Sequence, residues 1–154
     1  MATDVNQYLG NPNLKKANVP VEFTKEQIQE YQKCMDDPVY FIQEYMKIVS
    51  LDEGLVPFKM YDFQRNMVKT FHDNRFTICK LPRQSGKSTT IIAYLLHFVL
   101  FNPNVNVAIL ANKSSTARDI LGRLQLGYEH LPKWLQQGVI SWNKGSLDLE
   151  NGSS

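Results

Sequence analysis

The sequence has few cysteines, little net charge and no long uninterrupted apolar run. It therefore lacks the usual features of secreted, membrane-embedded and strongly basic DNA-binding proteins. It contains two cysteines, Cys34 and Cys79, which lie far apart, so we interpret them as core thiols of a reducing compartment and not as a disulfide or part of a metal site. A net charge of +2 is too small to argue for nucleic acid by itself. His97 and Asn102 interrupt the longest apolar run, and the N-terminus lacks the order of a signal peptide. We therefore expect an ordinary globular domain without a membrane segment.

The first 22 residues have no hydrophobic period. Residues 1–22 are rich in Asn, Pro and Lys, which predicts an extended arm that is ordered only where it lies on something else. Lys15 and Lys16 are candidates for a DNA contact, although adjacent lysines are more often a solvated surface. Residues 23–154 form the remainder, which we expect to belong to one domain.

Helix signals follow the arm. Thr24 and Gln27 fit a capping box, and the apolar residues after them recur at helical spacing. Asp37–Pro38 is a second helix start, and the amphipathic pattern after it continues to Val49. A connector broken by glycine and proline spans 51–59, and a further helix is expected over 60–72.

The glycine that opens a standard phosphate-binding loop is missing from the most informative stretch, Leu81–Thr90, which reads LPRQSGKSTT. The full pattern asks for a glycine five residues before Gly86, where this chain has Leu81. An apolar run over 75–80 predicts a strand before the loop, and a longer one over 90–100 predicts a buried helix after it. A polar turn joining these elements is the simpler alternative. Strand, Gly-Lys-Ser and helix in this order favour phosphate binding.

Each residue type in the loop suits a triphosphate with its magnesium ion. Gly86 lets the backbone approach a phosphate, and the amides of Ser85 to Thr89 point at it from a helix N-terminus. Lys87 is placed to meet the β- and γ-phosphate oxygens. The Ser88 hydroxyl is placed to coordinate Mg²⁺.

Gln64 precedes this loop by one helix and one short turn. Its carboxamide has a donor and an acceptor, so it can bind the edge of adenine in a bidentate way. The alternative is an exposed helix glutamine without a role in binding.

Two more regions complete the expected fold. A buried strand over 105–110 follows the long helix, and a right-handed crossover would place it parallel to the strand over 75–80. A helix is expected from Ser114 to about His130. Strands at 139–142 and 146–150 are then joined by a hairpin turn.

A second absence concerns acidic residues. No Asp-Glu pair follows an apolar strand after the loop, and a P-loop ATPase needs such a pair to hold Mg²⁺ and to orient water. Asp148 and Glu150 share a strand face but lack the buried lead-in. The turn signal Asn151–Gly152, with no returning strand after it, suggests a truncated chain.

The order of YDFQRNM, CKLPRQSGKSTT, VAILANKSSTARDIL and LPKWLQQGVISWNKGSLDLENGSS resembles the ATPase domain of large terminase subunits. These are the DNA-packaging motors of tailed bacteriophages, and the likeness is to the T-even type, from about Leu9 to the last residue. In this family the loop reads Arg-Gln-x-Gly-Lys-Ser/Thr without the first glycine, which accounts for Leu81. Pro82 departs from the small polar residue expected there.

The resemblance implies a fold, cofactors and residue roles. The fold would be an α/β P-loop NTPase-type parallel sheet flanked by helices, incomplete at the C-terminus, with a helical N-terminal segment. The cofactors would be ATP and Mg²⁺, with Gln64 at adenine, Ser88 at the metal, and Arg83 and Lys87 as catalytic cations. Arg83 would be an internal arginine finger, or alternatively a surface cation near the ligand. The implied binding residues are Gln64, Arg83, Gln84, Ser85, Gly86, Lys87, Ser88 and Thr89.

The resemblance also implies partners and a place of action. Double-stranded DNA, a portal protein, a small terminase subunit and further copies of the large subunit are the expected partners, in the cytoplasm of an infected bacterium. The chain would be the ATP-binding part of a motor that drives DNA into a procapsid, and the nuclease domain would lie beyond Ser154. The alternatives are a helicase-like or remodelling ATPase, and a non-catalytic fragment that binds nucleotide or partner chains.

Overall fold

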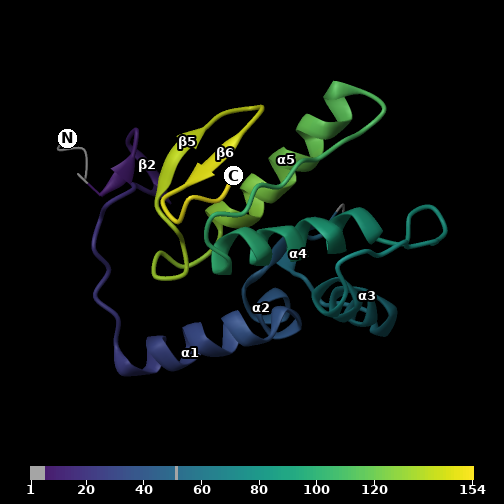
Figure 1. Cartoon of the computed structure of the whole chain (residues 1–154), viewed down its shortest axis with the longest axis horizontal. Coiled ribbons are helices and arrows are strands. Elements are labelled where there is room, and N and C mark those ends of the chain that lie inside the picture. Colours follow the sequence, from purple (N-terminus) through teal and green to yellow (C-terminus); the bar gives the residue numbers. More distant parts are fainter. Residues whose placement is uncertain (1–5, 51) are drawn as a thin grey trace.

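The computed structural model describes residues 6–50 and 52–154, in which helices alternate with short antiparallel hairpins (Figure 1). The helices are α1 (Lys25–Asp36), α2 (Pro38–Tyr45), α3 (Asp62–Asp73), α4 (Lys87–Phe101) and α5 (Ser114–Glu129). The strands are β1 (Gln7–Tyr8), β2 (Asn11–Lys15), β3 (Lys47–Ser50), β4 (Gly54–Pro57), β5 (Val139–Trp142) and β6 (Leu147–Leu149).

Local capping signals place the first two helices as the sequence predicts. The Thr24 hydroxyl accepts from the Gln27 amide at 3.2 Å, and the Gln27 side chain accepts from the Thr24 amide at 3.0 Å. An Asp37 carboxylate oxygen accepts from the amides of Val39 and Tyr40. Both starts are therefore confirmed, because a cap satisfies amides that a helix leaves unpaired.

The prediction that the second helix continues to Val49 is wrong. The helix ends at Tyr45, and β3 then pairs with β4 in antiparallel register, with Ile48 opposite Val56. The β-branched pair Ile48 and Val49 favours a strand, and Gly54 (φ 73°) supplies the left-handed turn residue that the hairpin needs.

Helix α4 lies at the centre of the molecule, between α2, α3 and α5 (Figure 1). Leu96 and Ala93 are fully buried, and Leu100 is nearly so. Phe41 of α2 and Tyr128 of α5 belong to the same buried cluster. Burying each large apolar side chain contributes about 1.5–3 kcal/mol, so the predicted all-round apolar helix is confirmed as the centre of the core.

The expected parallel sheet is not formed by the described residues. Neither 75–80 nor 105–110 lies in a strand, and the paired strands are all antiparallel. Without a neighbouring strand to cover it, the first segment exposes Phe76 by 83% and Ile78 by 99%. A parallel strand becomes buried only when partners and helices enclose it, and these contacts are not encoded within the segment itself.

The two cysteines differ in burial, because Cys34 lies in a core helix and Cys79 lies in the segment that does not form a strand. Cys34 is fully buried in α1, which confirms it as a core thiol. Cys79 is exposed, so the interpretation of Cys79 as a buried strand residue is wrong.

The N-terminal hairpin packs on the C-terminal one. Within the segment expected as an arm, β1 pairs with β2, and Lys16 forms a parallel bridge with Val139 of β5. Leu14 is buried, and the Lys15 ammonium contacts Glu150 at 3.0 Å. Lys15 is thus occupied within the protein and is not free for DNA.

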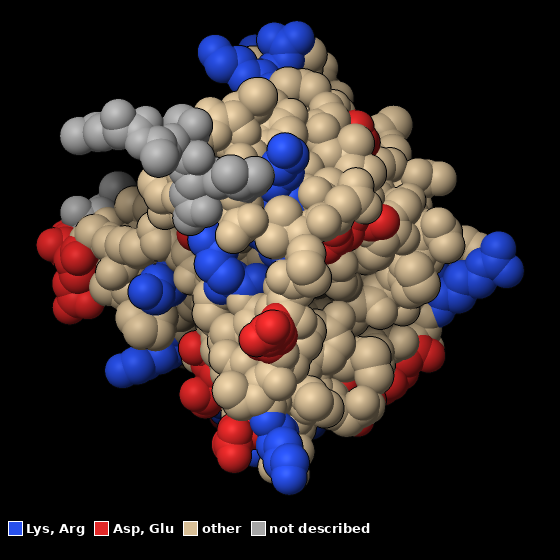
Figure 2. Space-filling model, turned by 90° about the vertical axis from the view of Figure 1, so that its left-hand side faces the viewer, with Lys and Arg blue, Asp and Glu red and all other residues tan. Residues whose placement is uncertain are grey.

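The face that carries this hairpin shows mixed charge. Figure 2 shows Lys and Arg interspersed with Asp and Glu on that side, outside the grey residues. No continuous basic surface forms there, in line with the small net charge. Among the described helices none has the length and apolarity needed to cross a bilayer.

Candidate phosphate-binding site

The predicted loop ends at the N-terminus of α4, and its glycine is held by two independent constraints. Gly86 caps the helix with φ 74° and ψ 10°, a left-handed conformation that residues with a Cβ rarely adopt. A Cβ at this position would lie 2.6 Å from Nε2 of Gln64, closer than real Cβ contacts allow. The sequence therefore needs glycine here for conformation and for space.

The N-terminus of α4 is free of side-chain caps. The amides of its first turn therefore keep their hydrogen-bonding capacity, and the helix dipole places about half a positive charge at this end. The Ser85 hydroxyl is buried beside it without a hydrogen-bond partner in the described part of the chain. An anion with several oxygens would satisfy these donors together.

The cations of the loop are not paired with acids among the described residues. The Lys87 ammonium donates to the Pro82 carbonyl at 3.1 Å, so it folds back across the loop. Arg83, Gln84 and Ser88 are exposed, and Thr89 is partly buried. The carbonyl of Pro82, the residue that departs from the family pattern, thus holds the central lysine.

Gln64 contacts the loop directly. Its side chain is 3% exposed, so the alternative of an exposed helix glutamine is wrong. Its Oε1 accepts from the Tyr61 amide at 2.9 Å, and its Nε2 donates to the Ser85 carbonyl at 3.4 Å. These two bonds tie the start of α3 to the loop and leave one N–H and one lone pair unused.

A cavity of about 510 Å³ lies between the loop and residues 58–64. Gln64 and Gly86 line it, as do Tyr61 and Phe63, whose rings stack at 5.9 Å with an interplanar angle of 9°. Sequence reasoning missed this aromatic pair, although aromatic-x-aromatic directly before Gln64 is the signal that could have found it. Flat apolar rings at the mouth of a cavity suit stacking on a base.

None of the described residues that line this cavity is acidic, and the described residues form no metal-binding cluster of three or more His, Cys, Asp or Glu. Glu150 serves elsewhere: it accepts from Lys15 and from the amides of Gly138 and Asn18. Burial alone would raise the pKa of Glu150, but these hydrogen bonds outweigh it and lower the pKa.

The matched part of the chain contains the loop and everything after it. A family described as "Terminase large subunit, T4likevirus-type, N-terminal" matches residues 78–154, which is half of the chain. The chain belongs to this family. The resemblance to large terminase subunits that the sequence shows is therefore confirmed.

The candidate site of this terminase combines residues inside the matched range with residues that precede it. Arg83 to Thr89 and α4 lie inside the matched range, whereas Gln64 and the aromatic pair lie before it. The fold brings Gln64 and the aromatic pair to one cavity with part of the loop, namely Gln84, Ser85, Gly86 and Thr89. The lining of that cavity does not include Arg83, Lys87 or Ser88.

Proposed function

We propose that this terminase region binds ATP with Mg²⁺ at the loop 81–89 and is the nucleotide-binding part of a phage DNA-packaging motor. The observation that carries the proposal is the uncapped N-terminus of α4 behind a left-handed Gly86, with Lys87 as the next residue. Backbone amides, helix dipole and ammonium then converge on one place, which is the recognition that a polyphosphate requires.

The residues present fit the nucleotide. The Lys87 ammonium, which donates to the Pro82 carbonyl in this structure, would bind the β- and γ-phosphate oxygens, and the exposed Arg83 would bind the γ-phosphate. The Ser88 hydroxyl would hold the magnesium ion, which offsets charge on the phosphates when bound. The backbone amides of residues 84–89 would donate to the remaining phosphate oxygens.

The base would lie in the adjoining cavity. The unused N–H and lone pair of Gln64 would bind adenine, and the ring pair of Tyr61 and Phe63 offers an apolar surface. Because Gln64 also bonds the loop, its carboxamide acts as a positioning group for the phosphates at the same time.

Membership of the terminase family supports the wider role. In that role the partners are double-stranded DNA, a portal protein, a small terminase subunit and other copies of the large subunit, in the host cytoplasm. Family membership also favours packaging over the helicase-like or remodelling alternative.

Binding is tested by titrating a fluorescent ATP analogue with Mg²⁺. Lys87→Ala removes a charge-assisted contact of about 1.5–3 kcal/mol, so affinity should fall about tenfold to a hundredfold. Lys80→Ala, which removes an exposed lysine before the loop, is the matched control and should bind normally. Equal affinity of the Lys87 variant and the unaltered chain would overturn the assignment.

A second candidate is nucleotide binding without hydrolysis by these 154 residues, which is favoured because no acidic side chain lines the cavity in the described part of the chain. Without a carboxylate to position water, the barrier rises by several kcal/mol. Phosphate release should then equal that of Lys87→Ala. Turnover above this level would implicate Asp148 first, because Glu150 is bound to Lys15.

A further inference from the structure

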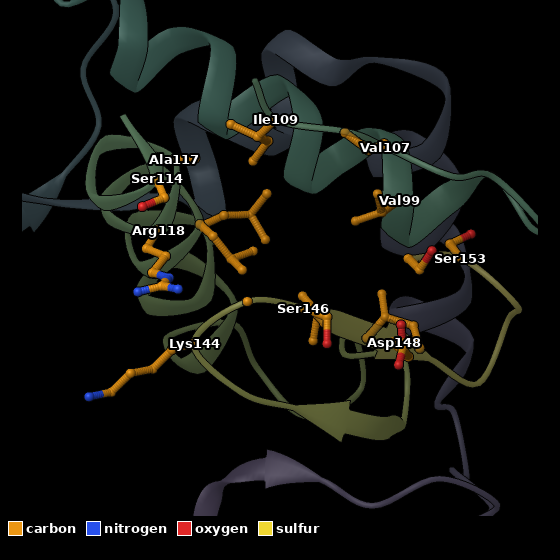
Figure 3. A pocket seen from close by; sticks show the side chains of 16 residues that line it. Val99, Val107, Ile109, Ser114, Ala117, Arg118, Lys144, Ser146, Asp148 and Ser153 are labelled. Carbon is orange, nitrogen blue, oxygen red and sulfur yellow. The ribbon is translucent and has the colours of Figure 1, made fainter. Parts of the chain in front are cut away.

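Two cavities lie apart from the phosphate loop, and they differ in their polar groups. The first, of about 370 Å³, has Val107 on one side and Ser146 on the other, and the Lys144 side chain at its edge points away from it (Figure 3). The second, of about 390 Å³, lies between residues 15–23, helix α1 and residues 134–137, and a largely buried ion pair belongs to its lining. Apolar walls with a few buried polar groups are typical of a binding site, so the second cavity is the stronger candidate.

The second cavity is lined by polar groups whose hydrogen-bonding capacity is not used up. Lys15 is 9% exposed, and its ammonium contacts Glu150 at 3.0 Å, but its other two N–H groups have no partner among the described residues. The Tyr31 hydroxyl accepts from Gln137 at 3.4 Å, which leaves its own proton to donate. The carbonyl oxygen of the Gln32 side chain is likewise unpaired in the described part of the chain. Because Lys15 and Glu150 offset each other's charge, these groups suit an uncharged polar ligand.

The walls of this cavity are apolar and partly exposed. Phe23 is 40% exposed and packs edge-on against Tyr31, with the ring centroids 6.0 Å apart. Ile28 of α1 is 57% exposed, and Trp134 is partly buried. A ligand with a short aliphatic stem would cover these side chains, and removing apolar surface from water favours binding.

Residues 19–23 lie along this cavity as a segment without backbone hydrogen bonds. Figure 1 shows the chain between β2 and α1 as a single extended trace at one edge of the molecule. The Asn18 amide donates to Glu150 at 2.9 Å, and Thr24 caps α1, so both ends of the segment are fixed. Between these ends, no backbone group of residues 19–23 has a hydrogen-bond partner in the described part of the chain.

The side chains of this segment alternate as they do in a strand. Val19 and Val21 are partly buried, whereas Pro20 and Glu22 are exposed. The N–H and C=O groups of a strand also alternate between its two edges. One edge therefore carries both groups of Val19, Val21 and Phe23, and the other lacks a donor at Pro20. The first edge is a complete template on which another strand can pair.

We propose that residues 19–23 bind an extended segment of a partner polypeptide, which places a glutamine side chain in the adjoining cavity. Main-chain hydrogen bonds supply affinity, and the cavity supplies specificity. A partner residue opposite Val21 has its side chain on the same face as Val21, which lines the cavity. The glutamine carbonyl accepts from Lys15 and Tyr31, and its NH₂ group donates to the Gln32 carbonyl. The phosphate loop does not line this cavity, so the proposal is independent of nucleotide binding.

The test titrates three blocked peptides, acetyl-Ser-Gln-Ser-amide and its Glu and Met counterparts, against the 154-residue chain. The Trp142→Phe variant leaves Trp134 as the only tryptophan, so its fluorescence reports binding at the cavity. The Gln peptide should bind about tenfold more tightly than either counterpart. The Met side chain leaves the Lys15 and Tyr31 donors unpaired, and the Glu side chain brings a second carboxylate beside Glu150.

Two matched variants test the cavity itself. Ile28→Asp places a charge on an exposed wall residue, where it can be introduced without disturbing the core, and should weaken binding of the Gln peptide about tenfold. Gln29→Asp introduces the same charge at the next residue of α1, which is exposed and does not line the cavity, and should leave the affinity unchanged.

Amide exchange measured by NMR tests the backbone pairing. In the complex with the Gln peptide, the amides of Val21 and Phe23 should exchange more slowly, whereas the Glu22 amide on the other edge should not change. Equal affinity of the three peptides or an equal effect of the two variants would overturn the proposal. Unchanged exchange at both Val21 and Phe23 would overturn it as well.

Discussion

The ammonium of Lys15 lies 3.0 Å from a carboxylate oxygen of Glu150, and this ion pair joins residues 135 positions apart. The Glu150 carboxylate also accepts from the amides of Gly138, at 2.6 Å, and Asn18, at 2.9 Å. One side chain thus fastens the N-terminal hairpin to the C-terminal one.

Replacement of Glu150 should therefore destabilise the fold. Glu150→Ala leaves a nearly buried ammonium and two amides without their acceptor, which should lower the free energy of unfolding by about 2–3 kcal/mol. Urea denaturation followed by tryptophan fluorescence measures it. Asp119→Ala, which breaks the exposed pair with Arg123, is the matched control and should change stability by less than about 1 kcal/mol. Equal effects of the two changes would contradict the role given to Glu150.

The free energy of unfolding should decrease at acidic pH because His97 becomes protonated. Burial, with a smaller contribution from nearby His72, lowers the pKa of His97 to about 4, whereas its Nε2–H donates to the Cys34 carbonyl at 2.9 Å. The folded state thus favours the neutral ring. Its contribution is complete above the unfolded pKa of about 6.5 and is lost as pH falls toward 4, amounting to about 3 kcal/mol.

The measurement is urea unfolding at pH values from 4 to 7. His97→Phe keeps an aromatic ring among Phe41 and Phe101 but removes the titration, so its stability should vary less over this range. His130→Gln, which removes a histidine that contacts the Leu126 carbonyl at the end of α5, is the control and should retain the slope of the unaltered chain. Identical slopes for His97→Phe and the unaltered chain would refute the assignment.

The two thiols should react differently with a thiol reagent. Cys79 is exposed, whereas burial raises the pKa of Cys34 to about 12, which suppresses its thiolate. One thiol per chain should react under native conditions and two in denaturant. Cys79→Ser should abolish the native reaction. Two slow thiols would instead place Cys79 in a buried strand.

Gln64 is predicted to hold the phosphate-binding loop and also to bind the adenine base. Gln64→Ala removes the bonds to the Ser85 carbonyl and the Tyr61 amide, so the loop loosens and both ATP and GTP should bind more weakly. The loss for ATP should be larger, because the adenine contact is lost as well. Titration of both nucleotides measures it, with Asn66→Ala, on the exposed side of the same helix, as the control. Equal losses of affinity for ATP and GTP would contradict the adenine contact and would leave Gln64 only its role in holding the loop.

Elements fixed by neighbouring residues could be predicted from the sequence, and those fixed by distant ones could not. Thr24 and Asp37 set helix starts through hydrogen bonds within three residues, so their signal is local. The predicted hairpin near the C-terminus is confirmed for the same reason, with the Asn143 side chain closing its turn. Segments 75–80 and 105–110 have strand composition, but a parallel sheet depends on partners that their own residues do not specify.

In the candidate site too, features set by neighbouring residues could be predicted and features set by distant residues could not. The loop motif itself predicts the glycine and the helix that follows it, because both obey local backbone rules. The burial of Gln64 against Ser85 arises from the packing of α3 on α4, and the pairing of Glu150 with Lys15 crosses almost the whole chain. Neither partner could be identified from spacing in the sequence.

The contacts of the N-terminal hairpin can form only after the residues of the C-terminal hairpin have been synthesised. Lys15 and Lys16 find native contacts on residues 136–150, so the ribosome has made nearly all of the described chain before these contacts exist. Contacts of such high sequence separation form late and slow the folding of a domain. During translation Lys15 and Lys16 therefore remain without these partners until residues 136–150 have been made.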